Sequence, residues 1–191
     1  MNVRRIAVFA SGSGTNAQNI FQYFFDNESI KIDSLWSNNP GAYALNRAAS
    51  MGIDTFIFDR RQLYETGEVL QTLKDRGVNL IVLAGFLWLV PESLILHFPI
   101  LNIHPALLPK YGGKGMYGMK VHQAVIDNRE VKTGISIHLV NQNYDEGAII
   151  FQADCAVSPD DTPESVARKV HELEYKYFPV VIEQFLLGKI K

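Results

Sequence analysis

Short apolar runs alternate with segments of helical periodicity through most of the 191 residues, and this alternation constrains the fold more than any other feature. The run Ile6–Ala10 is continuously apolar, as expected of a strand buried on both faces. The segment 15–27 then carries apolar residues at helical spacing, namely Ala17, Ile20, Phe21 and Phe24. Thr15, with Gln18 three residues later, predicts a capping box at the start of this helix.

The same scheme predicts further strands and helices up to residue 103. The strands are Ile30–Ser37, Thr55–Phe58, Leu80–Ala84 and Ile100–Ile103. The helices are Tyr43–Met51, one within Arg61–Arg76 and one from Pro91 toward His97. Strands that alternate with helices indicate crossover connections and a mainly parallel sheet with helices on both faces.

The pattern changes after residue 130. Two strand-like runs, Thr133–Val140 and Ala148–Val157, are joined by a connection too short for a helical crossover, which predicts an antiparallel pair. Thr162-Pro163 then starts a last helix, which Pro179 should kink or restart. No repeat or linker is visible, so we expect one α/β domain over 1–191, an open, twisted, Rossmann-like sheet.

Charge and cysteine content exclude several classes of function. A net charge of −2 and a pI near 6.2 give no footprint for nucleic acid or an anionic membrane. The single cysteine, Cys155, excludes an intramolecular disulfide and a zinc cluster built on thiolates, and fits a reducing compartment. The longest apolar stretch, Leu80–Val90, is too short to span a bilayer. We expect a cytoplasmic protein.

A glycine-rich turn, Ser11–Asn16, lies between the first strand and the first helix. Its backbone N–H groups and the helix N-terminus favour an anion such as phosphate. The turn lacks the lysine of a Walker A loop and the third glycine of the dinucleotide fingerprint, so a nicotinamide enzyme is disfavoured. A tight turn with serine and threonine caps is the alternative interpretation.

Asn102 and His104 are two residues apart at the end of a strand, where an open α/β sheet binds its ligands. An amide and an imidazole on one face can stabilise an oxyanion and move a proton, although such residues are often only structural. Asp145 lies in the loop between the last two strands. Asp145 either only forms the turn or, if it lies beside a histidine, raises the pKa of that imidazole and fixes its tautomer.

Five motifs in this order resemble those of the 10-formyltetrahydrofolate-dependent formyltransferase family, and in particular its members that formylate glycinamide ribonucleotide. They are Gly12-Ser13-Gly14-Thr15-Asn16, Leu83-Ala84-Gly85-Phe86, Asn102-Ile103-His104-Pro105, Leu107-Leu108-Pro109-Lys110-Tyr111 and Tyr144-Asp145-Glu146-Gly147. The resemblance extends from Arg5 to about Leu187 and implies the same fold.

The resemblance also implies the roles of individual residues. Catalysis falls to Asn102, His104 and Asp145. The ribonucleotide would be bound by Gly14, Thr15, Asn16, His171, Glu172, Leu173 and Glu174. The folate would be bound by Arg61, Leu87, Trp88, Leu89, Val90, Asn102, Asn141, Gln142, Asn143, Tyr144 and Asp145. A solvated helix charge at Glu174 and core packing at 87–90 are the alternatives.

Two departures from the family pattern bear on the site. The stretch 112–118 is longer and richer in glycine than usual and is a candidate lid, and Met119 replaces a frequent histidine. Trp88 stands where an arginine is frequent, which would change the outer wall of the folate pocket. A core tryptophan is the alternative interpretation of Trp88.

The resemblance implies formyl transfer from 10-formyltetrahydrofolate, as co-substrate, to the amine of glycinamide ribonucleotide in purine synthesis. It implies small-molecule substrates, no metal, no nucleic acid or membrane partner, and a monomer or homodimer. In this reaction Asp145 is expected to keep His104 protonated. A 10-formyltetrahydrofolate hydrolase, expected to carry a further N-terminal domain, and a non-catalytic phosphosugar or nucleotide-binding module are the alternatives. A methionyl-tRNA formyltransferase would need a C-terminal domain and a basic surface.

Overall fold

The computed structural model describes residues 3–190, which form two compact units with their boundary between Leu101 and Asn102. The seven strands have the sheet order β3-β2-β1-β4-β5-β6-β7, and β5 (Ile100–His104) contains the boundary between the units. The mainly parallel sheet with an antiparallel pair at its C-terminal strands confirms the expected fold class.

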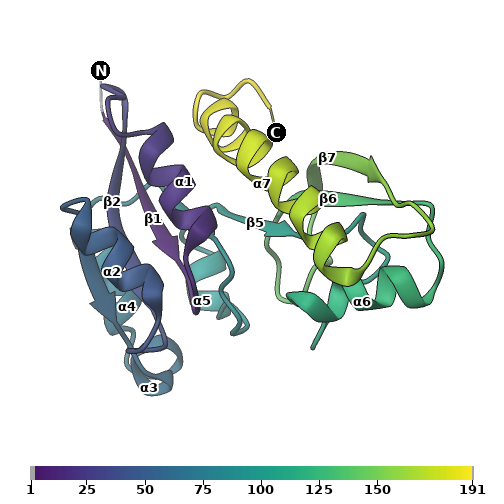
Figure 1. Ribbon diagram of the computed structural model, residues 1–191. Helices are drawn as coiled ribbons and strands as arrows, with labels where there is room; N and C mark the ends of the chain where they lie inside the picture. Colours follow the sequence, from purple (N-terminus) through teal and green to yellow (C-terminus); the bar gives the residue numbers. More distant parts are fainter. Residues whose placement is uncertain (1–2, 191) are drawn as a thin grey trace. The chain divides into compact units, whose positions relative to one another are not determined.

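The first unit is built on parallel strands β1 (Arg4–Phe9), β2 (Ile30–Ser37), β3 (Asp54–Ile57) and β4 (Leu80–Leu83). The side chains of Ile6–Phe9 in β1 and of all of β4 are apolar and buried on both faces, which places these two strands at the centre of the core. The helices are α1 (Thr15–Tyr23), α2 (Tyr43–Ser50), α3 (Arg60–Tyr64), α4 (Glu68–Asp75) and α5 (Glu92–Ile95). Figure 1 shows α1 and α2 side by side along the strands of this unit.

In the second unit, β6 (Lys132–Leu139) and β7 (Ile149–Ala156) form the predicted antiparallel pair. Two helices, α6 (Met119–Asp127) and α7 (Pro163–Leu186), pack together, and α7 also packs on β6 and β7 (Figure 1). Gly134 of β6 lies so close to β7 that an added Cβ would be 2.0 Å from the carbonyl oxygen of Ala153. Only glycine fits this pairing.

Three sequence predictions about helices were wrong in the first unit. The N-cap of α1 is Gly14, with no side-chain cap, because the Gln18 side chain bonds to Arg47 instead of closing a capping box with Thr15. The helix ends at Tyr23 because Asn27 accepts the N–H groups of Ser29 and Ile30 in a turn. The helix expected within 61–76 is two helices, divided at Gly67 in a left-handed conformation (φ 72°).

Helix α6 was not predicted, because it follows a glycine-rich stretch and its N-cap residue, Gly118, has no side chain that could cap the helix. Helix α7 does begin with the expected threonine cap and proline, and the Thr162 hydroxyl accepts from the N–H of Ser165 at 3.3 Å. Helix α7 does not restart at Pro179, which is buried in the helix beside Phe178, Val181 and Ile182. Packing of this apolar face outweighs the hydrogen bond that proline cannot donate.

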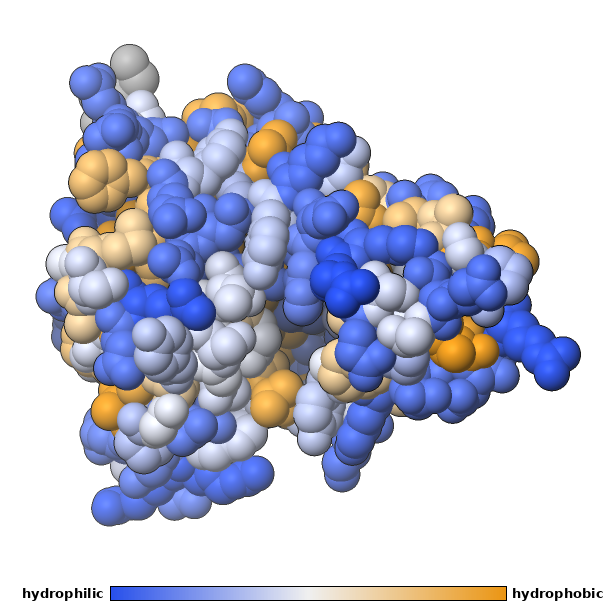
Figure 2. Space-filling view, in the orientation of Figure 1, coloured by the Kyte–Doolittle hydropathy of each residue, from blue (hydrophilic) through white to orange (hydrophobic). Residues whose placement is uncertain are grey.

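The visible surface is mostly hydrophilic, with apolar residues in small separate groups (Figure 2). Among residues 3–190 no helix is both long and apolar enough to span a membrane.

Candidate active site

The structure brings Asn102, His104 and Asp145 together in the second unit. Asn102 and His104 project from β5, and Asp145 lies in the loop between β6 and β7. His104 Nδ1 is 3.5 Å from one carboxylate oxygen of Asp145, and Asn102 Nδ2 is 3.4 Å from the other. An amide N–H, an imidazole nitrogen and a carboxylate therefore converge at the end of one strand, as an oxyanion and proton-transfer site requires.

The second ring nitrogen of His104 fixes the tautomer. Its Nε2 lies 2.7 Å from the backbone carbonyl oxygen of Tyr111, which can only accept a hydrogen bond. The proton of the neutral ring is therefore on Nε2, and Nδ1 faces Asp145 with its lone pair.

Burial lowers the pKa of His104, and Asp145 and the Tyr111 carbonyl offset only part of this effect. The side chain is only 4% exposed. Desolvation of the charged ring therefore favours the neutral form in the ligand-free site, and the expectation that Asp145 holds His104 as an imidazolium stays a prediction.

Asp145 has a left-handed backbone (φ 57°), which aspartate tolerates better than most residues. Burial raises the pKa of its carboxyl, but the facing histidines and the N–H of Gly113, which donates to Oδ2 at 2.9 Å, outweigh burial and lower it. A Cβ on Gly112 would lie 2.6 Å from Leu108 and 3.2 Å from Asp145. The absence of a side chain at Gly112 thus lets the backbone approach the carboxylate.

Sequence reasoning missed His138, which is buried on β6. Its Nε2 is 3.0 Å from Asn102 Nδ2 and 3.6 Å from Asp145, and its Nδ1 is 3.0 Å from the Leu139 carbonyl oxygen. His138 therefore orients the Asn102 amide. The signal was available, because a histidine at the end of the strand beside β5 should lie close to Asn102.

In the first unit, the turn expected to bind phosphate leads into α1 through Gly14 (φ 73°). A Cβ on Gly14 would lie 2.5 Å from Ala44 Cβ, and the Ala44 N–H donates to the Gly12 carbonyl at 3.1 Å. The turn is therefore packed against the start of α2. Its Gly14, Thr15 and Asn16 supply the first N–H groups of a helix, the geometry that favours an anion.

The segment Leu87–Val90, expected to bind the folate, follows β4 in the same unit. Trp88 is half-buried, with its ring 6.3 Å from Tyr64 and 6.2 Å from Phe58 between centroids. The Arg60 guanidinium lies 4.8 Å above the Trp88 ring. Arg60 is therefore the cation beside Trp88, and the partly exposed ring is not a fully buried core residue. The expected folate contact of Arg61 stays a prediction.

Helix α7 carries the other residues expected to bind the ribonucleotide, His171, Glu172, Leu173 and Glu174. Glu174 is 5% exposed and 3.9 Å from His171 Nε2, so the interpretation as a solvated helix charge is wrong. Glu172 and His171 are exposed and Leu173 is half-buried. The ring of buried His122 meets His171 edge-on at 6.5 Å between centroids.

The loop Asn141–Asp145 is ordered by its own side chains. The Asn141 carboxamide oxygen accepts from the Asn143 N–H at 2.9 Å, and Asn143 Nδ2 donates to Glu146 at 2.8 Å. Gln142 and Asn143 are exposed, and Tyr144 is half-buried beside Asp145. These two hydrogen bonds connect Asn143 to both sides of the turn.

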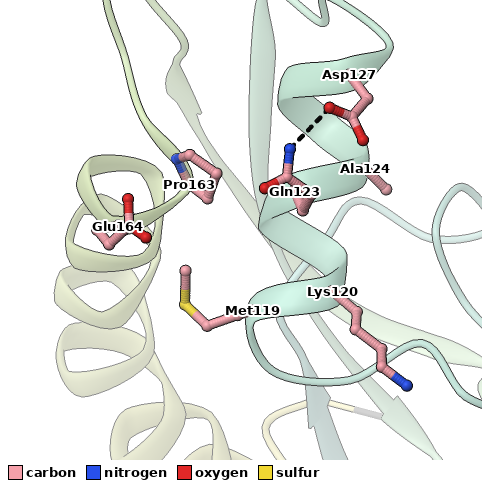
Figure 3. Close-up of a pocket in the computed structure, with 7 residues that line it drawn as sticks. All are labelled: Met119, Lys120, Gln123, Ala124, Asp127, Pro163 and Glu164. Atoms are coloured by element: carbon pink, nitrogen blue, oxygen red, sulfur yellow. Dashed lines mark hydrogen bonds between the residues drawn. The ribbon is translucent and has the colours of Figure 1, made fainter.

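A separate pocket of about 400 Å³ lies between α6 and the start of α7 (Figure 3). Met119 reaches into the gap between these helices, whereas Lys120 is directed away from it. The remaining lining residues are Gln123, Ala124, Asp127, Pro163 and Glu164, so none of the expected site residues lines this pocket. Within residues 3–190 no cluster of three histidine, cysteine or acidic side chains is arranged to hold a metal ion.

Comparisons with known proteins find similar chains over nearly the whole length of this one. The chain is 38% identical over 197 residues to the chloroplastic phosphoribosylglycinamide formyltransferase of Arabidopsis thaliana, covering 98% of this chain and 67% of the relative. It is 36% identical to the phosphoribosylglycinamide formyltransferase of Haemophilus influenzae, covering 99% of this chain and 90% of the relative.

A solved structure is similar throughout. It is the phosphoribosylglycinamide formyltransferase of Anaplasma phagocytophilum, with a TM-score of 0.89 and 33% identity over 98% of this chain and 89% of that one. The formyl transferase family model matches residues 4–182, which include the Asn102, His104 and Asp145 cluster. The chain belongs to the formyl transferase family.

Proposed function

We propose that this chain transfers the formyl group of 10-formyltetrahydrofolate to the amine of glycinamide ribonucleotide, a step of purine synthesis. The observation that carries the proposal is the convergence of Asn102, His104 and Asp145 in a chain of this family. Over nearly its whole length the chain is similar to enzymes named for this reaction, which supports glycinamide ribonucleotide as the acceptor of the formyl group.

The two units contribute different residues to this reaction and act as one formyltransferase domain. The family match, which includes both units, supports this. In the first unit, the N–H groups of Gly14, Thr15 and Asn16 bind the phosphate, and Leu87–Val90 with Arg61 grip the folate. In the second unit, Glu174 with its neighbours His171–Leu173 binds the ribose, and Asn141–Asp145 contacts the folate.

The formyl group arrives on the folate, and the side chains of the cluster handle the charge and the proton. The ribonucleotide's neutral amine attacks the formyl carbon, and the carbonyl electrons move to the oxygen. The Asn102 amide donates to this oxyanion. The neutral ring of His104, which burial favours, takes the proton from the attacking nitrogen at Nδ1, and the Asp145 carboxylate stabilises the imidazolium that forms. The imidazolium then protonates the leaving nitrogen as the carbon–nitrogen bond breaks. These groups complete the transfer without a metal ion or covalent enzyme intermediate.

The test is a rate measurement on the purified chain. Loss of the formylfolate is followed with glycinamide ribonucleotide present and then with it omitted. We expect rapid loss only with the amine present, and no activity above background with His104→Ala. Equal loss without the amine would identify a hydrolase, and binding of both compounds without turnover would identify a binding module. The cytoplasmic location and the monomeric or dimeric state stay predictions.

A further inference from the structure

Tyr111, seven residues after His104, has an unusual backbone conformation. Its φ of 57° lies in the left-handed region, which an aromatic residue rarely adopts. Strained residues persist where the surrounding structure holds them, and they gather at functional sites. The contacts of Tyr111 show what holds it and what the conformation achieves.

Both ends of Tyr111 are engaged. Its backbone carbonyl oxygen accepts from His104 Nε2 at 2.7 Å, and its phenol donates to Glu130 Oε1 at 2.8 Å. The Lys110 ammonium donates to the same carboxylate oxygen at 2.7 Å. Tyr111 therefore links the Glu130 carboxylate to the imidazole of His104.

Glu130 is itself anchored at the end of α6. The preceding Arg129 is left-handed (φ 51°), and the Glu130 N–H donates to the Val125 carbonyl at 3.1 Å. Burial and the Glu130 carboxylate raise the pKa of Tyr111 to about 12, so the phenol remains a donor through neutral pH.

We propose that Glu130 and Tyr111 are positioning residues for His104. Glu130 holds the phenol, the left-handed backbone then directs the Tyr111 carbonyl at Nε2, and this carbonyl keeps the ring proton on Nε2. The Nδ1 lone pair is thereby kept toward Asp145, where the proposed transfer needs it. This inference rests on the proposed function.

The opposing interpretation is that Lys110, Tyr111 and Glu130 only tie the segment after β5 to the end of α6. A purely structural tie would affect stability without changing the state of the His104 ring. The tautomer of His104 is therefore the decisive readout. Among the contacts of residues 3–190, the Tyr111 carbonyl is the one that favours a proton on Nε2. The Asp145 carboxylate lies 3.5 Å from Nδ1 and favours the other tautomer, and His138 contacts the Asn102 amide.

The experiment compares four variants of the full chain, labelled with ¹⁵N at histidine. Long-range ¹H–¹⁵N spectra report the tautomer of His104, and steady-state kinetics report kcat and KM. Tyr111→Phe and Glu130→Ala both remove the anchoring bond. Glu130→Gln keeps an oxygen that can accept from the phenol, and Lys110→Met removes the exposed ion pair while leaving the phenol bond intact.

We expect Tyr111→Phe and Glu130→Ala to show mixed His104 tautomers and a kcat lowered about tenfold, the factor that one hydrogen bond to a charged group supplies. KM for either substrate should stay within about twofold, because the loss concerns the transition state. Glu130→Gln should keep most of the activity, and Lys110→Met should match the parent.

An unchanged Nε2–H tautomer in folded Tyr111→Phe would overturn the proposal, as would a parental kcat despite mixed tautomers. Tyr111→Phe removes a single oxygen atom, so it decides the question if Glu130→Ala does not fold. An inactive parent would instead refute the proposed function, and the tautomer comparison does not depend on turnover.

Discussion

Replacing Asp145 by asparagine separates a catalytic role from a turn-forming one. Asparagine adopts the left-handed backbone at least as readily as aspartate, and its amide oxygen can still accept from the Gly113 N–H. The fold of the loop should therefore survive. The charge that faces His104 Nδ1 at 3.5 Å is lost.

The size of the effect follows from that distance. In the proposed reaction the imidazolium forms only during transfer, so its attraction to Asp145 stabilises the transition state more than the resting site. At the 3.5 Å separation and an effective dielectric constant of about 20, two unit charges interact by roughly 4–5 kcal/mol. Complete loss corresponds to roughly a thousandfold fall in kcat, within the range of about 10²–10⁴ for a positioned proton-transfer group.

The assay is steady-state kinetics with an NMR titration of His104 in parent and variant. We expect kcat to fall as stated, KM to change little, and the pKa of His104 to fall further, because the carboxylate that opposes burial is gone. Glu146→Gln is the matched control, since Glu146 is an exposed acid of the same loop whose contact is with Asn143. A near-parental kcat with an unmoved His104 titration would refute the reasoning.

Four further outcomes follow from the structure. Gly14→Ala should lower the melting temperature and raise KM for the ribonucleotide, whereas Gly12→Ala, which has open space, should melt like the parent; equal melting of the two would contradict the packing of the turn. A folate analogue should quench Trp88 fluorescence in a Trp36→Phe background after correction for absorption, and ribonucleotide alone should not; calorimetric binding without quenching would discredit the folate wall. Asp33→Asn should destabilise the fold by about 2–4 kcal/mol in urea unfolding, because it removes the charge of a buried carboxylate that pairs with Arg5 and Arg76, and a change below about 0.5 kcal/mol would contradict this. The pKa of Asp145 is lower in the folded chain than its ordinary value of 3.8, so its ionised form stabilises the fold above pH 3.8. This stability is lost as the pH falls through the pKa of the folded state. Asp145→Asn should therefore lose less stability than the parent on acidification.

Periodicity predicted the strands well because both faces of β1 and β4 are buried and their apolar runs are continuous. It failed where a local contact overrode a pattern. Gly67 divides one helical stretch, and Arg47 takes the Gln18 side chain away from the start of α1. Helix α6 escaped prediction because its beginning carries no side-chain cap.

The cluster of Asn102, His104 and Asp145 was predictable as residue types, but its electrostatics were not. Sequence reasoning placed a carboxylate beside a histidine and inferred an imidazolium. The structure adds the burial that lowers the pKa of His104 and the Tyr111 carbonyl that sets its tautomer. Both depend on the path of 108–113 through space, which no spacing rule fixes. Glu130 was missed for the same reason, whereas the position of His138 at the end of the strand beside β5 could have been used and was not.

The fate of the formyl carbon tests the central claim most directly. The chain is incubated with glycinamide ribonucleotide and a 10-formyltetrahydrofolate that carries ¹³C in the formyl group, and the ribonucleotide is analysed by mass spectrometry. Transfer by Asn102, His104 and Asp145 predicts one labelled formyl group on the ribonucleotide for each folate consumed, and none with His104→Ala. Label recovered as free formate, or an unmodified ribonucleotide after the folate is consumed, would contradict the account.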